Sequence, residues 1–441
     1  MNQYWLFGEV CGSARKLAWA SAGVLLVSAM GVSAATEVRV WHSLNPHNKK
    51  AFETLVKDFN KTQKEVSVDL KAFDSQDAIE AALAAAKKRD DKPHLVQLDD
   101  TRAPDDIAKR SYIQPLHVLA AKHPVKDAKW FLSDSNTFLR DTKGRLLAFP
   151  YMVDVPVMYY NIDAFKKANI KPAVPERSWK GLQDQLVTLA NNSTRNCPLT
   201  SDQPVSINLE NLAAVNNQPY TTLDNGLKAK GTPAFAFDLM YIRHLSMMIS
   251  WARTELLVKP QFDAVAAKRF ANGECAVLMS TSGNIGWFKD VKKLNFAISG
   301  LPYYPEVTTK PGNPFVGGSA LWSIAGQAKE GDAASVQFLS WLAQPDQASQ
   351  WYQSTGFLPL TKKAYDSAEK GYYKDLGEWQ TLVAAYAGNP GVTARGFRVH
   401  NYPKIKVMFQ QKLDSAFNGT QPAVTALKSA STEANRLMKE R

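Results

Sequence analysis

Three short segments carry residue types that can hold a small polar ligand. Ser280-Thr-Ser-Gly-Asn284 lies between a predicted strand and a predicted helix, where hydroxyls and backbone N–H groups could meet an anion. Phe315-Val-Gly-Gly-Ser319 sets two glycines before a strand, so bare backbone can approach a ligand. Arg395 and Arg398 can donate paired hydrogen bonds to phosphate or carboxylate. Each pattern also fits an ordinary cap, turn or surface arginine.

Three aspartates stand where ligands collect in open α/β sheets, and one tryptophan is a further candidate. Asp74 and Asp100 follow predicted strands, and Asp154 lies in an apolar stretch that crosses between two halves of the chain. Carboxylates there would accept hydrogen bonds from ligand hydroxyls or balance a cationic group, although each also fits a cap or turn acid. Trp179 either packs at a helix start or covers the edge of a pocket.

The sequence contains no arrangement typical of catalysis. None of the seven histidines stands in a His-Glu-x-x-His or other metal-ligand spacing. There is no Gly-x-Ser-x-Gly elbow of a hydrolase and no nucleotide-binding Gly-x-x-x-x-Gly-Lys-Ser/Thr loop. We therefore expect no catalytic residue, no metal and no cofactor.

The N-terminus has the order of a secretory signal peptide. Arg15 and Lys16 precede an apolar stretch from Leu17 to Met30, and Val32-Ser-Ala34 is a small-residue cleavage site. We expect residues 1–34 to be removed, and the rest to be a soluble monomer because no later apolar run is long enough to span a bilayer.

Charge and cysteine content narrow the class further. The formal charge is +12, but the lysines are spread thinly among acids, and export excludes nucleic acid as a partner. Cys11 lies within the signal segment, so Cys197 and Cys275 remain. In an oxidising compartment they either pair or stay as two separate buried thiols.

The predicted elements form an α/β protein with two lobes. Alternating strands at 37–41, 66–70 and 93–98 are separated by helical patterns at 49–62 and 77–89, which indicates crossover units around a largely parallel sheet. Residues 146–160 are an apolar crossing segment, and Asn161 is a predicted helix cap. Because strand patterns return late, we predict discontinuous lobes: 35–147 with 277–330, and a mainly helical 148–276 with 331–441.

Taken in order along the chain, several motifs resemble the family 1 extracellular solute-binding proteins of ABC importers. They are Val38-Arg-Val-Trp-His-Ser43, Pro156-Val-Met-Tyr-Tyr-Asn-Ile-Asp-Ala-Phe-Lys-Lys-Ala168, Phe270-Ala-Asn-Gly-Glu-Cys-Ala276, Gly317-Gly-Ser-Ala-Leu-Trp322, Phe338-Leu-Ser-Trp-Leu-Ala-Gln-Pro345, Ser354-Thr-Gly-Phe-Leu-Pro-Leu-Thr361 and Arg395-Gly-Phe-Arg398. The resemblance implies a two-lobed periplasmic-binding-protein fold with a hinge. It also implies a small-molecule ligand, location in the periplasm, and an inner-membrane permease and ATPase as partners.

The resemblance also implies a set of site residues. They are a phosphate-binding Arg398, the Ser282–Gly283 turn, the Gly317–Gly318 pair, a pocket-edge Trp179, Asp100 in place of a glutamate, and a disulfide between Cys197 and Cys275. The chain departs from the family pattern at three places: Asp74 replaces an aromatic residue, Val153 and Asp154 replace two serines, and Phe357 replaces a tyrosine.

These departures leave the ligand open. One hypothesis is glycerol 3-phosphate or a glycerophosphodiester; another is a sugar or polyol stacked on Trp41, Trp179, Trp287 or Trp322. Fewer hydroxyl donors and more carboxylates suit a polyol or a choline-like cation better than a dianion. A third hypothesis, from another class, is an exported hydrolase.

Overall fold

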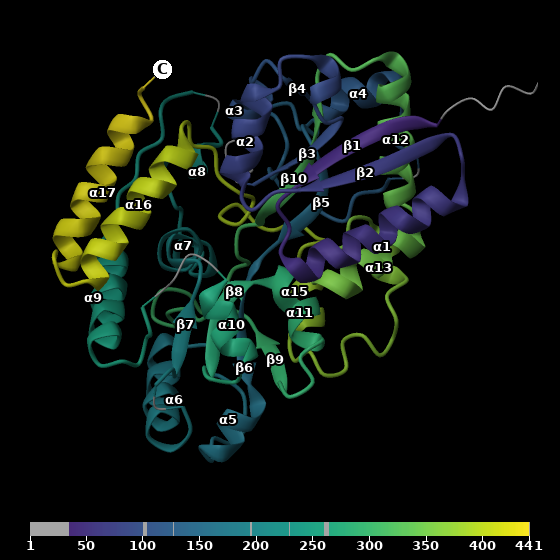
Figure 1. Ribbon diagram of the computed structural model, residues 1–441. Helices are drawn as coiled ribbons and strands as arrows, with labels where there is room; N and C mark the ends of the chain where they lie inside the picture. The colour runs from purple at the N-terminus through teal and green to yellow at the C-terminus, as the bar shows by residue number, and fades with distance from the viewer. Residues whose placement is uncertain are drawn as a thin grey trace, which may run out of the picture. The chain divides into compact units, whose positions relative to one another are not determined.

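The computed structural model describes residues 35–99, 104–126, 128–194, 196–228, 230–259 and 264–440. Within these ranges, strands form two sheets that are covered by helices (Figure 1). The signal-peptide prediction and Asp100 fall outside the described residues. No helix in the described part of the chain is both long and apolar enough to cross a membrane.

The first sheet has six strands and combines segments from distant parts of the sequence. β1 pairs in parallel with β2 and β3, whereas β10 runs antiparallel to β3, β4 and β5, so the sheet is mixed rather than largely parallel. Its strands are β1 (Thr36–His42), β2 (Val66–Ala72), β3 (Leu95–Leu98), β4 (Ile113–Gln114), β5 (Phe149–Asp154) and β10 (Gly317–Ile324).

The second sheet has the order β7-β8-β6-β9. β7 and β8 are parallel, and β6 runs antiparallel to both β8 and β9. The strands are β6 (Pro156–Asn161), β7 (Leu199–Ser201), β8 (Val277–Thr281) and β9 (Phe296–Ser299). The chain crosses between the sheets at Val155, within the predicted crossing segment.

The expected lobe boundaries differ from this arrangement. The sequence predicts residues 277–330 in the first lobe, but β8 and β9 belong to the second sheet and only β10 returns to the first. The C-terminal portion is divided as well, because α12 (Lys329–Leu342) and α13 (Pro345–Thr355) pack against β1 and α1 (Pro46–Thr62). Apolar strands carry no mark of the sheet that they join, which is why the predicted partition differs from the sheets of the structure.

Helices from segments before and after Val155 in the sequence pack around the first sheet. The cluster around β1 and α1 contains Val38, Val40, Phe52 and Phe59 together with Phe338 of α12. The remaining helical segments of this part are α2 (Gln76–Ala85), η1 (Arg89–Asp91), α3 (Pro104–Ala108), α4 (Leu116–Lys122) and α14 (Lys362–Asp366).

Helices dominate around the second sheet. Asn161 caps α5 by accepting hydrogen bonds from the N–H groups of Asp163 and Ala164, which confirms the predicted cap. The helical segments are α5 (Ile162–Lys167), α6 (Trp179–Asn192), η2 (Ser206–Glu210), α7 (Asn211–Val215), α8 (Thr222–Gly226), α9 (Leu239–Arg253), α10 (Val265–Ala271), η3 (Ser282–Asn284), α11 (Ile285–Lys289), α15 (Trp379–Ala384), α16 (Tyr402–Phe417) and α17 (Ala423–Leu437).

Cys197 and Cys275 are joined by a disulfide in this second part of the chain. They precede β7 and β8, which are adjacent parallel strands. Both side chains are fully buried, and the N–H of Ala276 donates to the carbonyl of Cys197. The bond therefore ties together the starts of two neighbouring strands that are far apart in the sequence.

Candidate functional site

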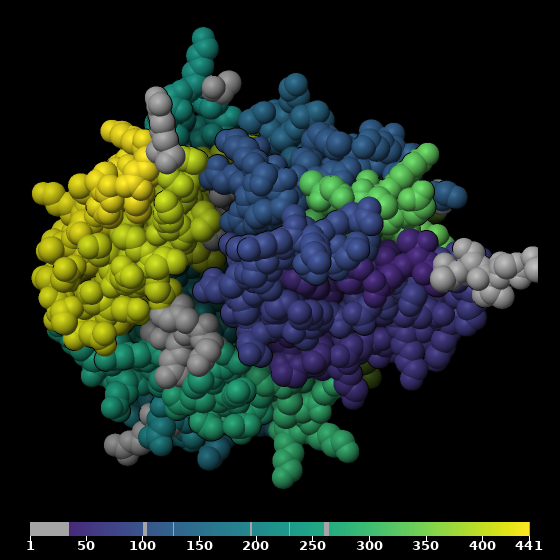
Figure 2. Space-filling view, turned by 45° about the horizontal axis from the view of Figure 1, so that its top comes forward, coloured from purple at the N-terminus to yellow at the C-terminus, as the bar shows by residue number. Residues whose placement is uncertain are grey.

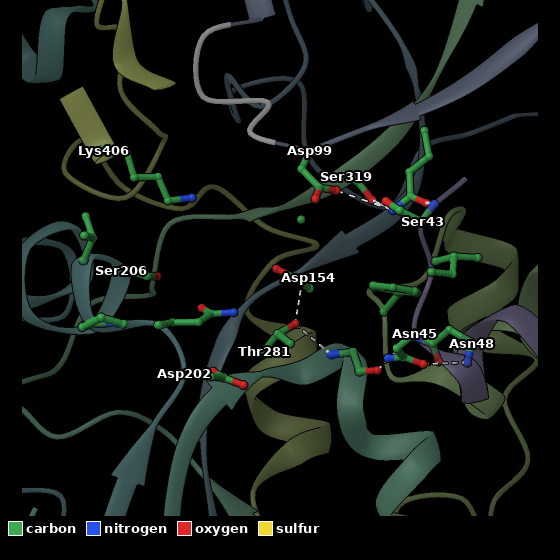
Figure 3. Close-up of a pocket in the computed structure, with 18 of the residues that line it drawn as sticks. Ser43, Asn45, Asn48, Asp99, Asp154, Asp202, Ser206, Thr281, Ser319 and Lys406 are labelled. Carbon is green, nitrogen blue, oxygen red and sulfur yellow. Dashed lines mark hydrogen bonds between the residues drawn. The ribbon is translucent and has the colours of Figure 1, made fainter. Parts of the chain in front are cut away.

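A cavity of about 450 Å³ lies between the two sheets (Figure 3). Its walls are formed by the segment after β1, the ends of β3, β5 and β8, the start of β10, the segment after β7, and α16. The lining residues are Ser43, Leu44, Asn45, Asn48, Gln97, Asp99, Asp154, Asp202, Gln203, Pro204, Val205, Ser206, Thr281, Gly283, Gly318, Ser319, Phe357, Lys406 and Gln410. In the space-filling view, α16 and α17 (yellow) border the N-terminal segment (purple to blue) along a narrow seam (Figure 2).

Gln97 fixes the side of the cavity formed by the first sheet. Its side-chain carbonyl accepts a hydrogen bond from the N–H of Ser43 at 3.0 Å, and its amide donates to the Ser319 hydroxyl at 2.9 Å. The same amide lies 3.5 Å from Asp99. Because Gln97 is buried and makes contacts to β10 and to the segment after β1, it holds these lining groups in fixed positions.

The N-terminus of α1 forms a link between the two sheets. The Asn45 side chain caps the helix by accepting from the N–H of Asn48 at 2.8 Å. The Asn48 amide donates to the carbonyl of Gly283, which follows β8, at 3.1 Å. The Asn48 side-chain oxygen is buried and has no hydrogen-bond partner among the described residues.

Asp202 directly follows β7 and lines the cavity. Its Oδ2 accepts a 2.7 Å hydrogen bond from Ser280, whose hydroxyl in turn accepts from Asn284 at 3.0 Å. The residue as a whole is half-buried, but its Oδ1 is inaccessible to solvent and has no hydrogen-bond partner among the described residues. Burial, with Asp154 nearby, raises the pKa of Asp202 to about 7.

Asp154, at the end of β5, is hydrogen-bonded to Thr281, the last residue of β8. The Thr281 hydroxyl donates to Asp154 Oδ2 at 2.5 Å, and the same hydroxyl accepts from the N–H of Gly283 at 3.0 Å. Figure 3 shows Asp154 and Asp202 on either side of Thr281. Two carboxylates are thus gathered around the end of one strand.

The charge of the described lining is negative. It carries three aspartates, Asp99, Asp154 and Asp202, against one lysine, Lys406 of α16. Among the described lining residues, Phe357 is the only aromatic one, and it packs on Trp351 with 5.7 Å between ring centroids. The cavity therefore offers many hydrogen-bonding groups and carboxylates but little stacking surface.

Three of the predicted site residues lie together in this lining: Asp154, Gly318 and Phe357. Ser282 is fully buried just behind it, where its hydroxyl lies 3.4 Å from the N–H of Val155. The predicted anion site at this turn does not form, because the N–H groups of Ser282 and Gly283 already donate to Val155 and Thr281.

Two other predicted site residues, Asp74 and Trp179, lie elsewhere. Asp74 is exposed in the loop between β2 and α2. Trp179 is 2% exposed and packs on His244 and Trp251, so it is a core residue and does not form a pocket edge. Trp179 packs at the start of α6, which is the other of the two roles that the sequence allows for it.

Arg398 lies outside the lining residues of the cavity. Its guanidinium donates to a carboxylate oxygen of Asp105 in α3 and, at 2.5 Å, to the carbonyl of Arg140. Two residues further on, His400 lies 3.0 Å from Asp106 of the same helix. These bonds attach the segment before α16 to α3. Arg398 therefore has a structural role, which is the alternative to phosphate binding.

Sequence reasoning missed Asn48, Gln97, Asp202 and Lys406. Gln97 had a usable signal, because it is a polar residue inside an otherwise apolar strand. Asp202 had a weaker one, since it directly follows a three-residue strand that no periodicity reveals. Within the described ranges no group of three histidine, cysteine or acidic side chains could hold a metal ion.

Residues 54–392 match the bacterial extracellular solute-binding proteins, and the chain belongs to this family. Its members are not enzymes; they bind small molecules for ABC importers and deliver them to a permease and an ATPase.

Individual relatives share the fold along nearly the whole chain. The chain is 29% identical to the sn-glycerol-3-phosphate-binding periplasmic protein UgpB of Shigella dysenteriae and 28% identical to that of Escherichia coli K12, in each case over 95% of this chain and 97% of the relative. Among solved structures, UgpB of Mycobacterium tuberculosis in complex with glycerophosphocholine has a TM-score of 0.75 at 18% identity, covering 92% of this chain and 98% of that one. The maltose-bound MalE3 of T. maritima has a TM-score of 0.73 at 16% identity, covering 91% of this chain and 100% of that one. These structures establish a two-lobed α/β fold.

Proposed function

We propose that this chain captures a glycerophosphodiester in the periplasm and delivers it to an inner-membrane permease and its ATPase. The observation that carries the proposal is the charge of the cavity, where Asp99, Asp154 and Asp202 face one lysine among the described lining residues. A phosphate monoester such as glycerol 3-phosphate carries about −1.5 to −2 charges at pH 7. A phosphodiester carries a single negative charge, so these carboxylates repel it less.

The relatives support a ligand that contains glycerol and phosphate. The UgpB proteins of S. dysenteriae and E. coli are named for binding sn-glycerol 3-phosphate, and the M. tuberculosis protein binds glycerophosphocholine. In this chain, Asp154 stands where the family pattern has a serine, which adds a carboxylate to the cavity. A ligand with the same glycerol and phosphate parts but a weaker negative charge fits that change.

A sugar or polyol is the second candidate, and the maltose-bound T. maritima neighbour favours it. The amides and hydroxyls of Asn45, Gln97 and Ser319 suit such a ligand. However, Trp41 and Trp322 are buried, Trp287 packs on Phe288, and no tryptophan is among the described lining residues. A sugar would therefore bind with Phe357 as its stacking surface, which is weak support for a pyranose ring.

Isothermal titration calorimetry on protein beginning at Ala35 tests the proposal. We expect sn-glycero-3-phosphocholine and sn-glycero-3-phosphoglycerol to bind at least tenfold more tightly than sn-glycerol 3-phosphate, maltose and glycerol. A preference for sn-glycerol 3-phosphate or for maltose would contradict it. A thermal-shift screen of the same compounds serves as an independent measurement, because a ligand that prefers the folded state raises the melting temperature.

A further inference from the structure

Lys406 is the one cation among the described residues that line the cavity. It lies on α16, and its half-buried side chain points the ammonium group into the cavity (Figure 3). Arg398, by contrast, is held outside the lining by Asp105 and the carbonyl of Arg140. A lysine ammonium is a compact charge with three donors and is a common partner of phosphate. The positive charge that a phosphodiester meets in this cavity therefore comes from α16.

Ser206 adds a hydroxyl donor on the same side of the cavity. It is the first residue of η2, and its Oγ accepts a hydrogen bond from the Asn211 amide at 2.9 Å. The hydroxyl proton of Ser206 is therefore left to donate, and it has no acceptor among the described residues. Figure 3 shows this hydroxyl directed into the cavity, near Lys406. An ammonium group and a hydroxyl can each donate to a different oxygen of one phosphate.

Buried contacts hold α16 against η2. The hydroxyl of Tyr402, one turn before Lys406 on α16, donates to Glu210 of η2 at 2.5 Å, and both side chains are fully buried. Residues four apart lie on the same face of a helix, so this bond turns Lys406 toward the cavity. Gln410, one turn further on, lines the cavity as well. The two donors are thus positioned by the packing of two elements.

The groups that suit glycerol hydroxyls lie elsewhere in the lining. Gln97 is bonded to Ser319 and lies 3.5 Å from Asp99. Figure 3 shows Asp99 and Ser319 across the cavity from Lys406, with Asp154 between them. A phosphate on the Lys406 side is kept away from the charge of Asp99, and carboxylates on the other side can accept hydrogen bonds from hydroxyls. The distribution of charge thus gives the cavity two different ends.

We propose that Lys406 and Ser206 bind the phosphate of the ligand in place of Arg398, and that the glycerol end lies toward Asp99 and Gln97. The inference rests on the proposed function and adds the residues that bind the phosphate. Lys406 supplies the charge and Ser206 a single hydrogen bond, so affinity depends more on Lys406.

Calorimetry on Lys406→Met tests the contact, because methionine keeps an unbranched side chain and removes the charge. The ligands are sn-glycero-3-phosphoglycerol, which is an anion, and sn-glycero-3-phosphocholine, which has no net charge. Both contain the same phosphodiester, so a direct contact predicts that both lose affinity by about tenfold or more. A lysine that only balances the charge of the cavity acts on the net charge of the ligand, and its loss would weaken the glycerol ester alone.

Matched variants provide the controls. Lys404→Met removes a charge from the exposed surface of the same helix, and we expect both affinities to stay within threefold of wild type. Ser206→Ala should lower both affinities about three- to tenfold. Asn211 keeps its 3.0 Å bond to the Ser206 carbonyl in that variant, so the local fold should be retained. If Lys406→Met does not fold, Lys406→Gln and Ser206→Ala supply the same test.

Three results would overturn the inference. Unchanged affinity for both diesters in folded Lys406→Met refutes it while the proposed function stands, and so does a loss confined to the glycerol ester. A tenfold loss of both diesters in Arg398→Ala, with Lys406→Met unaffected, assigns the phosphate to Arg398. Failure of the wild-type protein to bind any diester refutes both proposals.

Discussion

Gly318 has a backbone conformation that a side chain would disrupt. Its φ is +89°, and a Cβ built there would lie 2.4 Å from the carbonyl oxygen of Met152 and 2.9 Å from the backbone nitrogen of Asp154. Gly318 is thus required because β5 lies so close, and not only because a ligand approaches. We expect Gly318→Ala to lower the free energy of unfolding by about 2–4 kcal/mol, from the positive φ and the clash together.

Gly326 provides a matched control for this substitution. Its φ is +83°, but a Cβ there would meet no atom within 4 Å. Gly326→Ala should therefore cost only the conformational strain, about 1–2 kcal/mol. Urea denaturation of both variants measures the difference, and equal destabilisation would show that the contact with β5 does not matter. Ligand affinity should fall only in Gly318→Ala, because the clash displaces Asp154.

Arg398 is predicted from the structure to stabilise the fold more than it contributes to ligand affinity. Its side chain is 16% exposed and bonded to Asp105 and to the Arg140 carbonyl. Because Asp105 is itself 37% exposed, solvent screens the pair, and we expect Arg398→Ala to cost about 1–2 kcal/mol in unfolding free energy. Affinity for a glycerophosphodiester should change by less than threefold.

Asp105→Asn is the control for this prediction. If the pair is structural, Asp105→Asn should lower stability by less than Arg398→Ala, because Arg398 keeps its bond to the Arg140 carbonyl, and the double variant should cost less than the sum of the two. A loss of affinity above tenfold in Arg398→Ala, with the thermal unfolding midpoint unchanged, would instead assign Arg398 to the ligand as the family resemblance implies. Calorimetry and thermal unfolding on the same samples decide between them.

At the scale of elements, the disulfide should contribute strongly to stability. Cys197 and Cys275 are 78 residues apart and join the segments before β7 and β8. Loop-closure entropy alone gives about 4.5 kcal/mol for a loop of this length, and disulfides typically contribute about 2–4 kcal/mol. We expect the double variant Cys197→Ala/Cys275→Ala to lose about that amount in urea denaturation.

Reduction of the wild-type protein provides the independent check. It should reproduce the stability of the double variant, and mass spectrometry should find no free thiol before reduction. An unchanged unfolding midpoint in both samples would show that the bond contributes nothing to stability. Because the bond lies away from the cavity lining, ligand affinity of the folded variant should stay close to that of wild type.

Local patterns predicted the elements well but not their partners. Helical spacing of Phe52, Leu55, Val56 and Phe59 is sufficient to predict α1, since its apolar face needs only a surface to cover. The sheet that a strand joins depends on contacts far along the chain, so β8 was assigned to the wrong side. An apolar five-residue strand can pair with many neighbours, and only tertiary packing selects one.

At the scale of the whole molecule, strand ends made two of the three correctly predicted lining residues predictable, whereas Phe357 was found through the family resemblance. Asp154 and Gly318 lie at the meeting edge of paired strands β5 and β10, so their place in the order of elements brings them to the cavity. Arg398 and Trp179 depend on side-chain partners from distant segments, namely Asp105 and His244. The spacing of residues along the sequence does not predict such side-chain pairs.

The stability of the whole protein should fall in acid because three buried histidines resist protonation. Burial lowers the pKa of His42 and of His94 to about 4 and that of His244 to about 3. His94 accepts a hydrogen bond from the N–H of Arg39, a role that requires an unprotonated nitrogen. In the unfolded chain a histidine titrates near its ordinary pKa of about 6.5, so between about pH 4 and 6.5 the unfolded state binds more protons.

Asp202 acts in the opposite direction, because its pKa of about 7 makes the folded state hold a proton that the unfolded chain releases above about pH 4. Three histidines against one aspartate leave a net uptake of about two protons on unfolding, so stability should drop by about 2–3 kcal/mol per pH unit below about pH 6. Urea denaturation across this range measures the slope. His244→Gln should make the slope shallower by about one proton, and Asp202→Asn should make it steeper by about one proton. If both variants keep the wild-type slope, these two groups do not control the acid stability of the protein.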